Sequence, residues 1–296
     1  DKGITPGKSI VIYGYEEEKI KKMAALLIKG GYENVRIYLD FKDDWVNHEE
    51  RPLASLSGYR MLVYPEWLNQ LITEKSAPEM NQDDFVVCHA HYDHIEDYHK
   101  GHIPGAIPLN TLDLESPEDW NCRSPREVEE ALKKHGIRHD TTVILYGRFS
   151  YPDFSDPYPG KSAGHLASIR CALILLWAGV RDVRVLNGGI ISWESAGLPV
   201  TTKPEHPVPV SHFGAPIPGR PHLIVNIPEA RELLHADDGL LVSVRSLEEF
   251  TGQKSGYHYI EKKGRIPGAV FGNCGTDAYH MENYRNPDHT DRKSVV

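Results

Sequence analysis

The chain has 296 residues, of which 40% are hydrophobic and 25% are charged, an ordinary composition for a globular protein of one large or two smaller domains. Its net charge is −9, and it has no basic cluster interleaved with aromatic residues. This argues against nucleic-acid binding, which needs clustered Lys and Arg to contact phosphates. No apolar run is long enough to cross a bilayer, so the sequence excludes a membrane span.

The first 57 residues hold a strand, a helix and a second strand. The β-branched and aromatic run at 9–14 ends in glycine and predicts a buried strand that runs into a loop. A helical pattern follows at 19–29. Gly31 is a natural stop at its C-terminus, and the next strand lies within 31–37.

The middle of the chain alternates between helical and strand patterns. The predicted helices are 65–72, 125–135 and 163–178, and the predicted strands are 85–88, 142–146 and 183–186. Such alternation is typical of a parallel sheet covered by helices. The sequence therefore predicts the α/β class, with a mostly parallel central sheet flanked by helices.

Internal repeats determine the predicted domain organisation. Residues 9–14 match 142–147, and 31–37 match 179–185. The sequence GHIPGA at 101–106 matches GRIPGA at 264–269, in the same register as a second match between Pro65-Glu66 and Pro228-Glu229. Matches at fixed spacing indicate repeated structural modules.

The repeats divide the chain into half a module, a whole module and another half. The predicted parts are the back half of a first module at 1–57, a complete second module at 60–203, a Pro-rich extended linker at 204–220 and the front half of a third module at 221–296. We expect both chain ends to be cuts in a longer gene product. Pairing of the two terminal halves with each other is the alternative.

Two motifs give the modules a family resemblance. Glu96-Asp97-Tyr98 followed by 101–106 resembles the first signature of rhodanese domains, and 186–193 followed by 196–199 resembles their closing signature. The segment 134–148 is similar to the periplasmic three-rhodanese-domain sulfurtransferases of enterobacteria. The resemblance implies rhodanese-like modules and a periplasmic location, with the cytoplasm as the alternative.

The resemblance also implies a chemistry for the full-length protein. A cysteine in the loop between a strand and the next helix takes a sulfane sulfur, for example from thiosulfate, and holds it as a persulfide. It then passes the sulfur to an acceptor. Backbone N–H groups at the helix N-terminus lower the pKa of such a thiol and favour the thiolate. A small anionic sulfur donor and a thiol acceptor are the expected partners, and no cofactor is expected.

No cysteine stands in the loops where this chemistry is expected. The loop of the first copy, 14–19, holds three glutamates that repel an anion, and the loop of the second copy, from Gly147, contains no cysteine. The third copy stops before its loop. Cys274 superficially resembles an active loop, but it follows the 264–269 motif instead of a strand. We therefore expect the chain alone to be inactive.

A competing pattern suggests a metal site. His89-Ala-His91-Tyr-Asp93-His94 matches the HxHxDH motif of the metallo-β-lactamase superfamily, and imidazole and carboxylate groups suit zinc or iron. The other interpretation is a His-rich loop in the variable space before Glu96. We favour the loop, because a rhodanese module leaves no room for the larger metallo-β-lactamase fold.

Two further features bear on ligands and partners. Arg245 matches the arginine that closes the first core strand in the family that the chain resembles, and an ion pair inside the module is favoured over contact with a substrate. The insertion at 149–160 places Tyr and Phe among prolines, which suits contact with a partner protein. A non-catalytic binding or scaffold module is therefore the alternative function from a different class.

Overall fold

The structure is a computed structural model, and its described residues divide into two compact units, 6–54 and 58–272. Each unit is described by itself. The residues described are 6–48, 50–54, 58–80, 84–93, 95–148, 164–256 and 260–272. Within these residues, no helix combines the length and the apolar character that crossing a bilayer requires.

The first unit is a two-stranded parallel sheet with one long helix. Its elements are β1 (Ile10–Tyr13), α1 (Glu17–Lys29), β2 (Val35–Tyr38) and a short π-helical turn, η1 (Phe41–Val46). Helix α1 buries Ile20 and Ala24. Only residues 14–16 join β1 to α1, so the helix begins almost directly after the strand.

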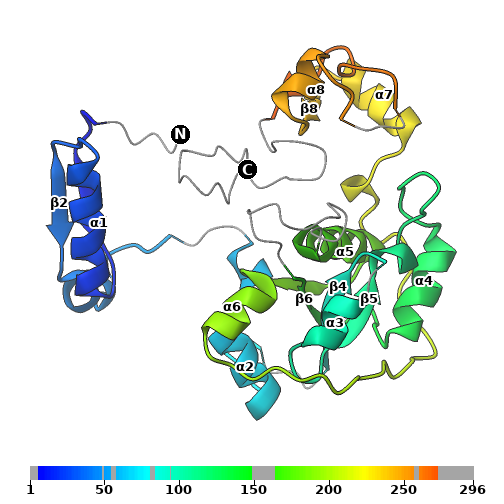
Figure 1. Cartoon of the computed structure of the whole chain (residues 1–296), viewed down its shortest axis with the longest axis horizontal. Coiled ribbons are helices and arrows are strands. Elements are labelled where there is room, and N and C mark those ends of the chain that lie inside the picture. The colour runs from blue at the N-terminus through cyan, green and yellow to red at the C-terminus, as the bar shows by residue number, and fades with distance from the viewer. Residues whose placement is uncertain are drawn as a thin grey trace. The chain divides into compact units, whose positions relative to one another are not determined.

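The second unit contains a five-stranded sheet in the order β3-β7-β6-β4-β5, and every neighbouring pair is parallel (Figure 1). The strands are β3 (Leu62–Val63), β4 (Phe85–His91), β5 (Ile107–Asn110), β6 (Thr142–Tyr146) and β7 (Asp182–Leu186). The predicted α/β fold with a mostly parallel sheet is therefore confirmed.

Helices cover both faces of this sheet and create two cores. The helices are α2 (Pro65–Glu74), α3 (Glu96–Lys100), α4 (Pro125–Lys134), α5 (Gly164–Ala178) and α6 (Gly189–Ser195), with short turns η2 (Tyr59–Met61) and η3 (Thr111–Asp113). Cys88 packs with residues of α4 and α5 in one core. Val87, the next residue towards the N-terminus, packs with residues of α2 and α6 in the other. Because successive side chains of a strand point to opposite faces of the sheet, β4 contributes residues to both cores.

Local sequence explains where several elements begin. Helix α4 starts after Ser124, whose side chain accepts a hydrogen bond from the backbone N–H of Glu127, while Glu127 accepts one from the Ser124 N–H. Pro125 occupies the first helical position, where its missing N–H costs nothing. Strand β6 is buried at all five positions, as a central parallel strand should be.

Strand β4 differs from its prediction in one respect that concerns the candidate site. It continues to His91, three residues beyond the predicted end at Cys88. His89 and His91 therefore lie on a buried strand, and the interpretation of both as members of a variable loop is wrong. The continuation of β4 past Cys88 was not predicted, because a polar residue such as histidine usually marks the end of an apolar strand pattern.

The segment 201–220, called the strap below, lies against the second module as an extended chain. His102 and Thr201 exchange two backbone hydrogen bonds of 2.9 Å, the N–H of Val210 donates to the Lys133 carbonyl, and the N–H of Arg220 donates to the Trp177 carbonyl. The strap is extended and Pro-rich, as expected for a linker, but it is bound along its length.

The start of the third module contains η5 (Pro221–Leu223), α7 (Ile227–His235), β8 (Val242–Ser243), α8 (Leu247–Thr251) and β9 (Val270–Phe271). Strands β8 and β9 are parallel neighbours. Val242 pairs with Val270 here, and Cys88 pairs with Ile107 in the second module. Ile107 and Val270 each directly follow a Gly-x-Ile-Pro-Gly-Ala motif, so Val242 is the counterpart of Cys88. When the two modules are superposed, Ser243 therefore corresponds to His89, and Arg245 corresponds to His91.

Candidate functional site at the carboxyl edge of the second sheet

The carboxyl ends of β4, β5 and β6 meet at one edge of the second sheet. The order of connection reverses between β6 and β4, and ligands of open α/β sheets bind beside such a reversal. Gly147 and Arg148 leave β6 at this edge, and α5 begins at Gly164. The chain between them, including the 149–160 insertion, lies outside the described residues.

His89 lies at this edge with no exposed surface and no hydrogen-bond partner on either ring nitrogen. Its ring meets the edges of Tyr146, with centroids 4.9 Å apart, and Tyr98, at 5.7 Å. Burial, together with smaller effects of the nearby His91 and Arg148, lowers the pKa of His89 to about 3. His89 is therefore neutral at physiological pH, and its acceptor nitrogen is free.

His91 lies two residues further along the same face of β4 and is 6% exposed. Its Nδ1 is buried without a hydrogen-bond partner. Burial lowers the pKa of His91, and the carboxylates of Asp113, Asp97, Asp93 and Glu96 act in the opposite direction. Four carboxylates thus oppose the effect of burial on the His91 ring.

Two more buried polar atoms at this edge have no hydrogen-bond partner, Oγ1 of Thr111 and Nε of Arg148. The Arg148 Nε lies 4.0 Å from Oδ1 of Asp97, and its Nη2 donates to the Gly101 carbonyl at 3.5 Å. A buried polar atom left without a partner costs about 1–3 kcal/mol. Several such atoms at one edge mark a place that water or a ligand fills.

The full HxHxDH motif does not assemble a metal site in the described part of the chain. No group of three or more His, Cys, Asp or Glu side chains that could hold a metal is found there. The backbone N–H of Asp93 donates to Oδ1 of Asn110, which holds the turn after β4. His94 lies outside the described residues.

The cysteines within the described residues are unsuited to nucleophilic chemistry. Cys88 and Cys171 are fully buried in the core under α4 and α5, and burial raises both pKa values, that of Cys88 to about 12. Cys122 is half-buried, and burial together with Glu115 raises its pKa to about 11. All three are protonated at neutral pH. Cys274 lies outside the described residues.

Arg245 is engaged inside its own module. Its guanidinium donates to the Gly264 carbonyl at 2.8 Å, to Oε1 of the buried Glu249 at 3.1 Å and to the Ser255 carbonyl. These bonds tie α8 to the Gly-x-Ile-Pro-Gly-Ala loop. The bond to Glu249 is an ion pair inside the module, of the kind that the sequence favoured for Arg245.

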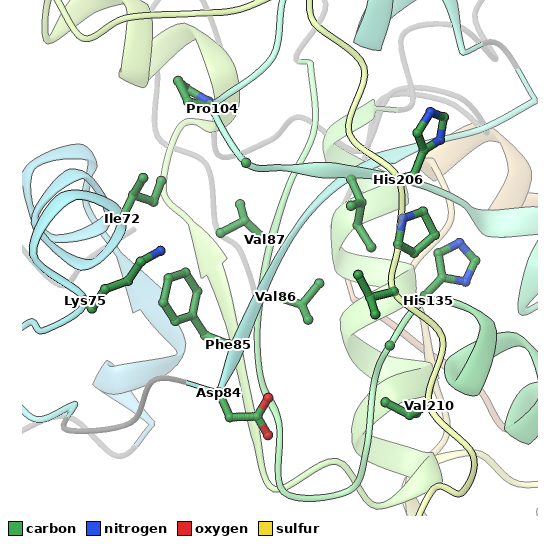
Figure 2. Close-up of a pocket in the computed structure, with 15 residues that line it drawn as sticks. Ile72, Lys75, Asp84, Phe85, Val86, Val87, Pro104, His135, His206 and Val210 are labelled. Atoms are coloured by element: carbon green, nitrogen blue, oxygen red, sulfur yellow. The ribbon is translucent and has the colours of Figure 1, made fainter.

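A pocket of about 400 Å³ lies at the opposite, amino edge of the sheet (Figure 2). Figure 2 shows Asp84, His135 and His206 around it; Asp84 directly precedes β4, His135 directly follows α4, and His206 belongs to the strap. Asp84 pairs with Arg138 at 2.6 Å, and Nδ1 of His135 lies 2.8 Å from the Ala131 carbonyl. This pocket lies at the amino end of β4, whereas the loop after β6 lies at the carboxyl end of the sheet.

Sequence reasoning missed one polar cluster that fastens the strap. His102 stacks on Tyr98 with ring centroids 3.7 Å apart, its Nε2 lies 3.0 Å from the Lys203 carbonyl, and the Tyr98 hydroxyl accepts from the N–H of Glu205. Both residues belong to the first family signature. The signature predicted a module, but the partners of these two side chains in the strap lie more than 100 residues away in the sequence.

The comparisons with known proteins agree with this architecture. Residues 65–196 match the model of the rhodanese-like domain. The thiosulfate sulfurtransferase YnjE of Escherichia coli K12 is 39% identical over 286 residues, which cover 96% of this chain and 61% of YnjE. The chain belongs to the rhodanese family. Within this family, a putative thiosulfate sulfurtransferase, SseA of Mycobacterium bovis, is 27% identical over 81% of the chain and 75% of SseA.

Solved structures of EanB are also similar to this rhodanese chain. The wild-type EanB structure is 51% identical, with a TM-score of 0.89, and the match covers 99% of this chain and 68% of EanB. Other EanB structures contain hercynine, or ergothioneine together with a cysteine persulfide. The chain thus spans about three fifths of YnjE and two thirds of EanB.

Proposed function

We propose that the protein to which this chain belongs transfers a sulfane sulfur through a cysteine persulfide, and that this chain alone cannot do so. The proposal is supported by the sulfurtransferase names of the relatives and by the persulfide in EanB. The donor is a small anionic sulfur compound such as thiosulfate. The acceptor is a thiol or another soft nucleophile.

The observation that carries the second half of the proposal is the state of the cysteines. The sequence has none between Gly14 and Lys19 or between Gly147 and Ala163, where strand-to-helix loops of the first two modules lie. Cys88, Cys122 and Cys171 are held as thiols by burial. A persulfide cycle needs an accessible thiolate.

A second candidate acceptor is the imidazole ring of a betaine. The likeness to EanB, at 50–51% identity over nearly the whole chain, favours it over a simple thiol. Ergothioneine carries one sulfur atom more than hercynine. Breakage of the persulfide S–S bond with formation of a C–S bond would supply that atom, and the ring proton would pass to the released thiolate.

We infer that the second module serves the reaction as a scaffold. The strap is hydrogen-bonded to this module from Thr201, which pairs with His102, to Arg220, whose N–H donates to the Trp177 carbonyl directly before the third module begins. Main-chain hydrogen bonds of this kind fix where the next segment starts. The second module therefore contributes by positioning the third module, and not by supplying a reacting side chain.

The direct test is thiosulfate:cyanide sulfurtransferase activity of the 296-residue chain. We expect the wild-type chain to show no turnover above that of the Cys274→Ser variant, because neither has a loop thiolate. The longer protein, extended to the length of EanB or YnjE, is expected to turn over. A panel of acceptors assayed with the longer protein, hercynine and thiols among them, distinguishes the two candidates.

Turnover by the short chain that disappears in Cys274→Ser would contradict the proposal, because it would make Cys274 the nucleophile. Turnover that survives in Cys274→Ser would point to another residue. An inactive longer protein would remove the catalytic assignment. The alternative, a binding module that uses the 149–160 insertion, predicts that deletion of the insertion abolishes capture of a partner protein.

A further inference from the structure

The strap is attached next to α3 through a histidine that is bonded on both sides of its ring. His102 has no exposed surface. Its Nδ1 lies 2.8 Å from the Tyr98 carbonyl oxygen, and its Nε2 lies 3.0 Å from the Lys203 carbonyl oxygen. Tyr98 belongs to α3 and Lys203 belongs to the strap, so the imidazole ring of His102 bridges the two segments.

Both bonding partners of this ring are acceptors, and this determines how many protons the ring needs. A carbonyl oxygen cannot donate a hydrogen bond, so each ring nitrogen must carry hydrogen to bond its carbonyl. A neutral imidazole carries one such hydrogen, and an imidazolium carries two. Only the protonated ring of His102 therefore makes both bonds at once. A neutral ring would direct a nitrogen lone pair at one of the two carbonyl oxygens.

The stacked ring of Tyr98 also suits a positive charge on His102. The two ring centroids lie 3.7 Å apart, and the planes are tilted by 12°. The face of an aromatic ring carries partial negative charge and attracts a cation held over it. Burial opposes a charge on the imidazole, whereas hydrogen bonds to the charged form favour it. The two carbonyl bonds and the stacking therefore act together against the effect of burial.

Other charged groups near the ring are balanced by partners of their own. His89 interacts electrostatically with His102, but it is neutral, as described above. Arg148 reaches the Gly101 carbonyl, and its Nε lies 4.0 Å from a carboxylate oxygen of Asp97 on α3. On the strap, the Lys203 ammonium is 82% exposed and lies 3.9 Å from a carboxylate oxygen of Glu205. Each of the two cations thus has a carboxylate beside it, which weakens its repulsion of a charged imidazole.

The bond to the strap is the one that a neutral ring would lose. The bond to the Tyr98 carbonyl is shorter and joins residues four positions apart, whereas the bond to the Lys203 carbonyl joins residues 101 positions apart. Lys203 lies between two other attachment points. Thr201 pairs with the backbone of His102, and the N–H of Glu205 donates to the Tyr98 hydroxyl at 2.9 Å.

We propose that His102 makes the attachment of the strap sensitive to pH: the protonated ring bonds both the Tyr98 and the Lys203 carbonyls, and loss of one proton breaks the bond to Lys203. Histidine is the side chain that ordinarily changes its charge around neutral pH. The strap is therefore held more firmly in mildly acidic than in mildly alkaline solution. Because the strap leads into the third module, the start of this connection responds to protons.

The experiment follows the ring and the strap of the ¹⁵N-labelled 296-residue chain by NMR at about pH 5.5 and about pH 8, on either side of the ordinary titration of histidine near 6.5. Long-range ¹H–¹⁵N spectra show which ring nitrogens carry hydrogen. We expect hydrogen on both ring nitrogens of His102 at the lower pH and on one at the higher pH.

Hydrogen exchange of the Glu205 N–H reports the attachment itself. After correction for the intrinsic exchange rate, its protection should be roughly tenfold greater at the lower pH, because a hydrogen bond from a charged donor is stronger than one from a neutral donor. The N–H of Val210 is the internal reference. It bonds to the Lys133 carbonyl further along the strap, so its protection corrects for any change in the stability of the whole module.

The variants His102→Gln and His206→Gln complete the test. Glutamine does not titrate, so the protection of Glu205 relative to Val210 should no longer depend on pH in His102→Gln. His206 is an exposed histidine of the strap, so His206→Gln should behave as the wild-type chain does. If His102→Gln fails to fold, the spectra of the wild-type chain still decide the question. A ring nitrogen of His102 without hydrogen at the lower pH, or equal relative protection of Glu205 at both pH values in the wild-type chain, would overturn the proposal.

Discussion

Replacing Phe213 with alanine should lower the free energy of unfolding of the second unit by about 3–5 kcal/mol, the usual cost of removing a fully buried phenylalanine. Phe213 has no exposed surface and packs in the core under α4 and α5, although it belongs to the strap. The N–H of His139 donates to its carbonyl at 2.9 Å. The phenyl ring is therefore the main apolar anchor of the strap.

The measurement is urea denaturation of the Phe213→Ala variant at neutral pH, with Val208→Ala as the control. Val208 is on the same strap but is 81% exposed, so its truncation should change the free energy by no more than about 0.5 kcal/mol. If both variants unfold at the same urea concentration as the wild-type chain, the strap is not part of the cooperative unit.

Acidification should destabilise the second unit through His89. Its pKa is about 3 in the folded state because the ring is buried, whereas an unfolded histidine titrates near 6.5. The unfolded chain therefore binds a proton first as the pH falls. The stabilisation is complete above about pH 6.5 and is lost towards pH 3, at about 1.4 kcal/mol per pH unit for this one group.

This expectation is tested by urea denaturation between pH 7.5 and 4.5 with a chelator present, for the wild-type chain and for His89→Phe. Over the two units below pH 6.5 the wild-type chain should lose about 3 kcal/mol more than the variant. His99→Phe should retain the wild-type slope, because His99 is exposed. Equal slopes for the wild-type chain and His89→Phe would show that His89 is protonated or solvated in the folded protein.

The sequence predicted the framework of the second module well, because its strands are continuous apolar runs. Strand β6 has the predicted bounds, and α5 begins within one residue of its prediction. Strand β5 was missed because it is short and contains Pro108, and α6 because it lies inside a motif that was interpreted only as a signature. Whether a short segment forms a strand or a helix depends more on packing against neighbouring elements than on its own sequence pattern.

The candidate site was only partly accessible from sequence. The strand-to-helix loop after β6 follows from the repeat, and so does its lack of a cysteine. The burial of His89 does not follow, because it requires Tyr98 and Tyr146 to close around a strand that continues past its apolar part. The hydrogen bonds of Arg245 likewise could not be predicted from sequence, because two of the acceptors are backbone carbonyls whose positions are known only from the fold.

The way the strap is attached has a consequence for how the chain comes apart. Gly136 and Gly214 allow it to lie so close that an added Cβ would come within 2.6 Å of the Val208 carbonyl oxygen in one case and 2.7 Å of the His139 ring in the other. Attachment on both sides of Pro209 means that a single protease cut at this residue severs the chain without releasing either piece. The two fragments should migrate together on a native gel and separate only when denatured, as the parts of a nicked enzyme do.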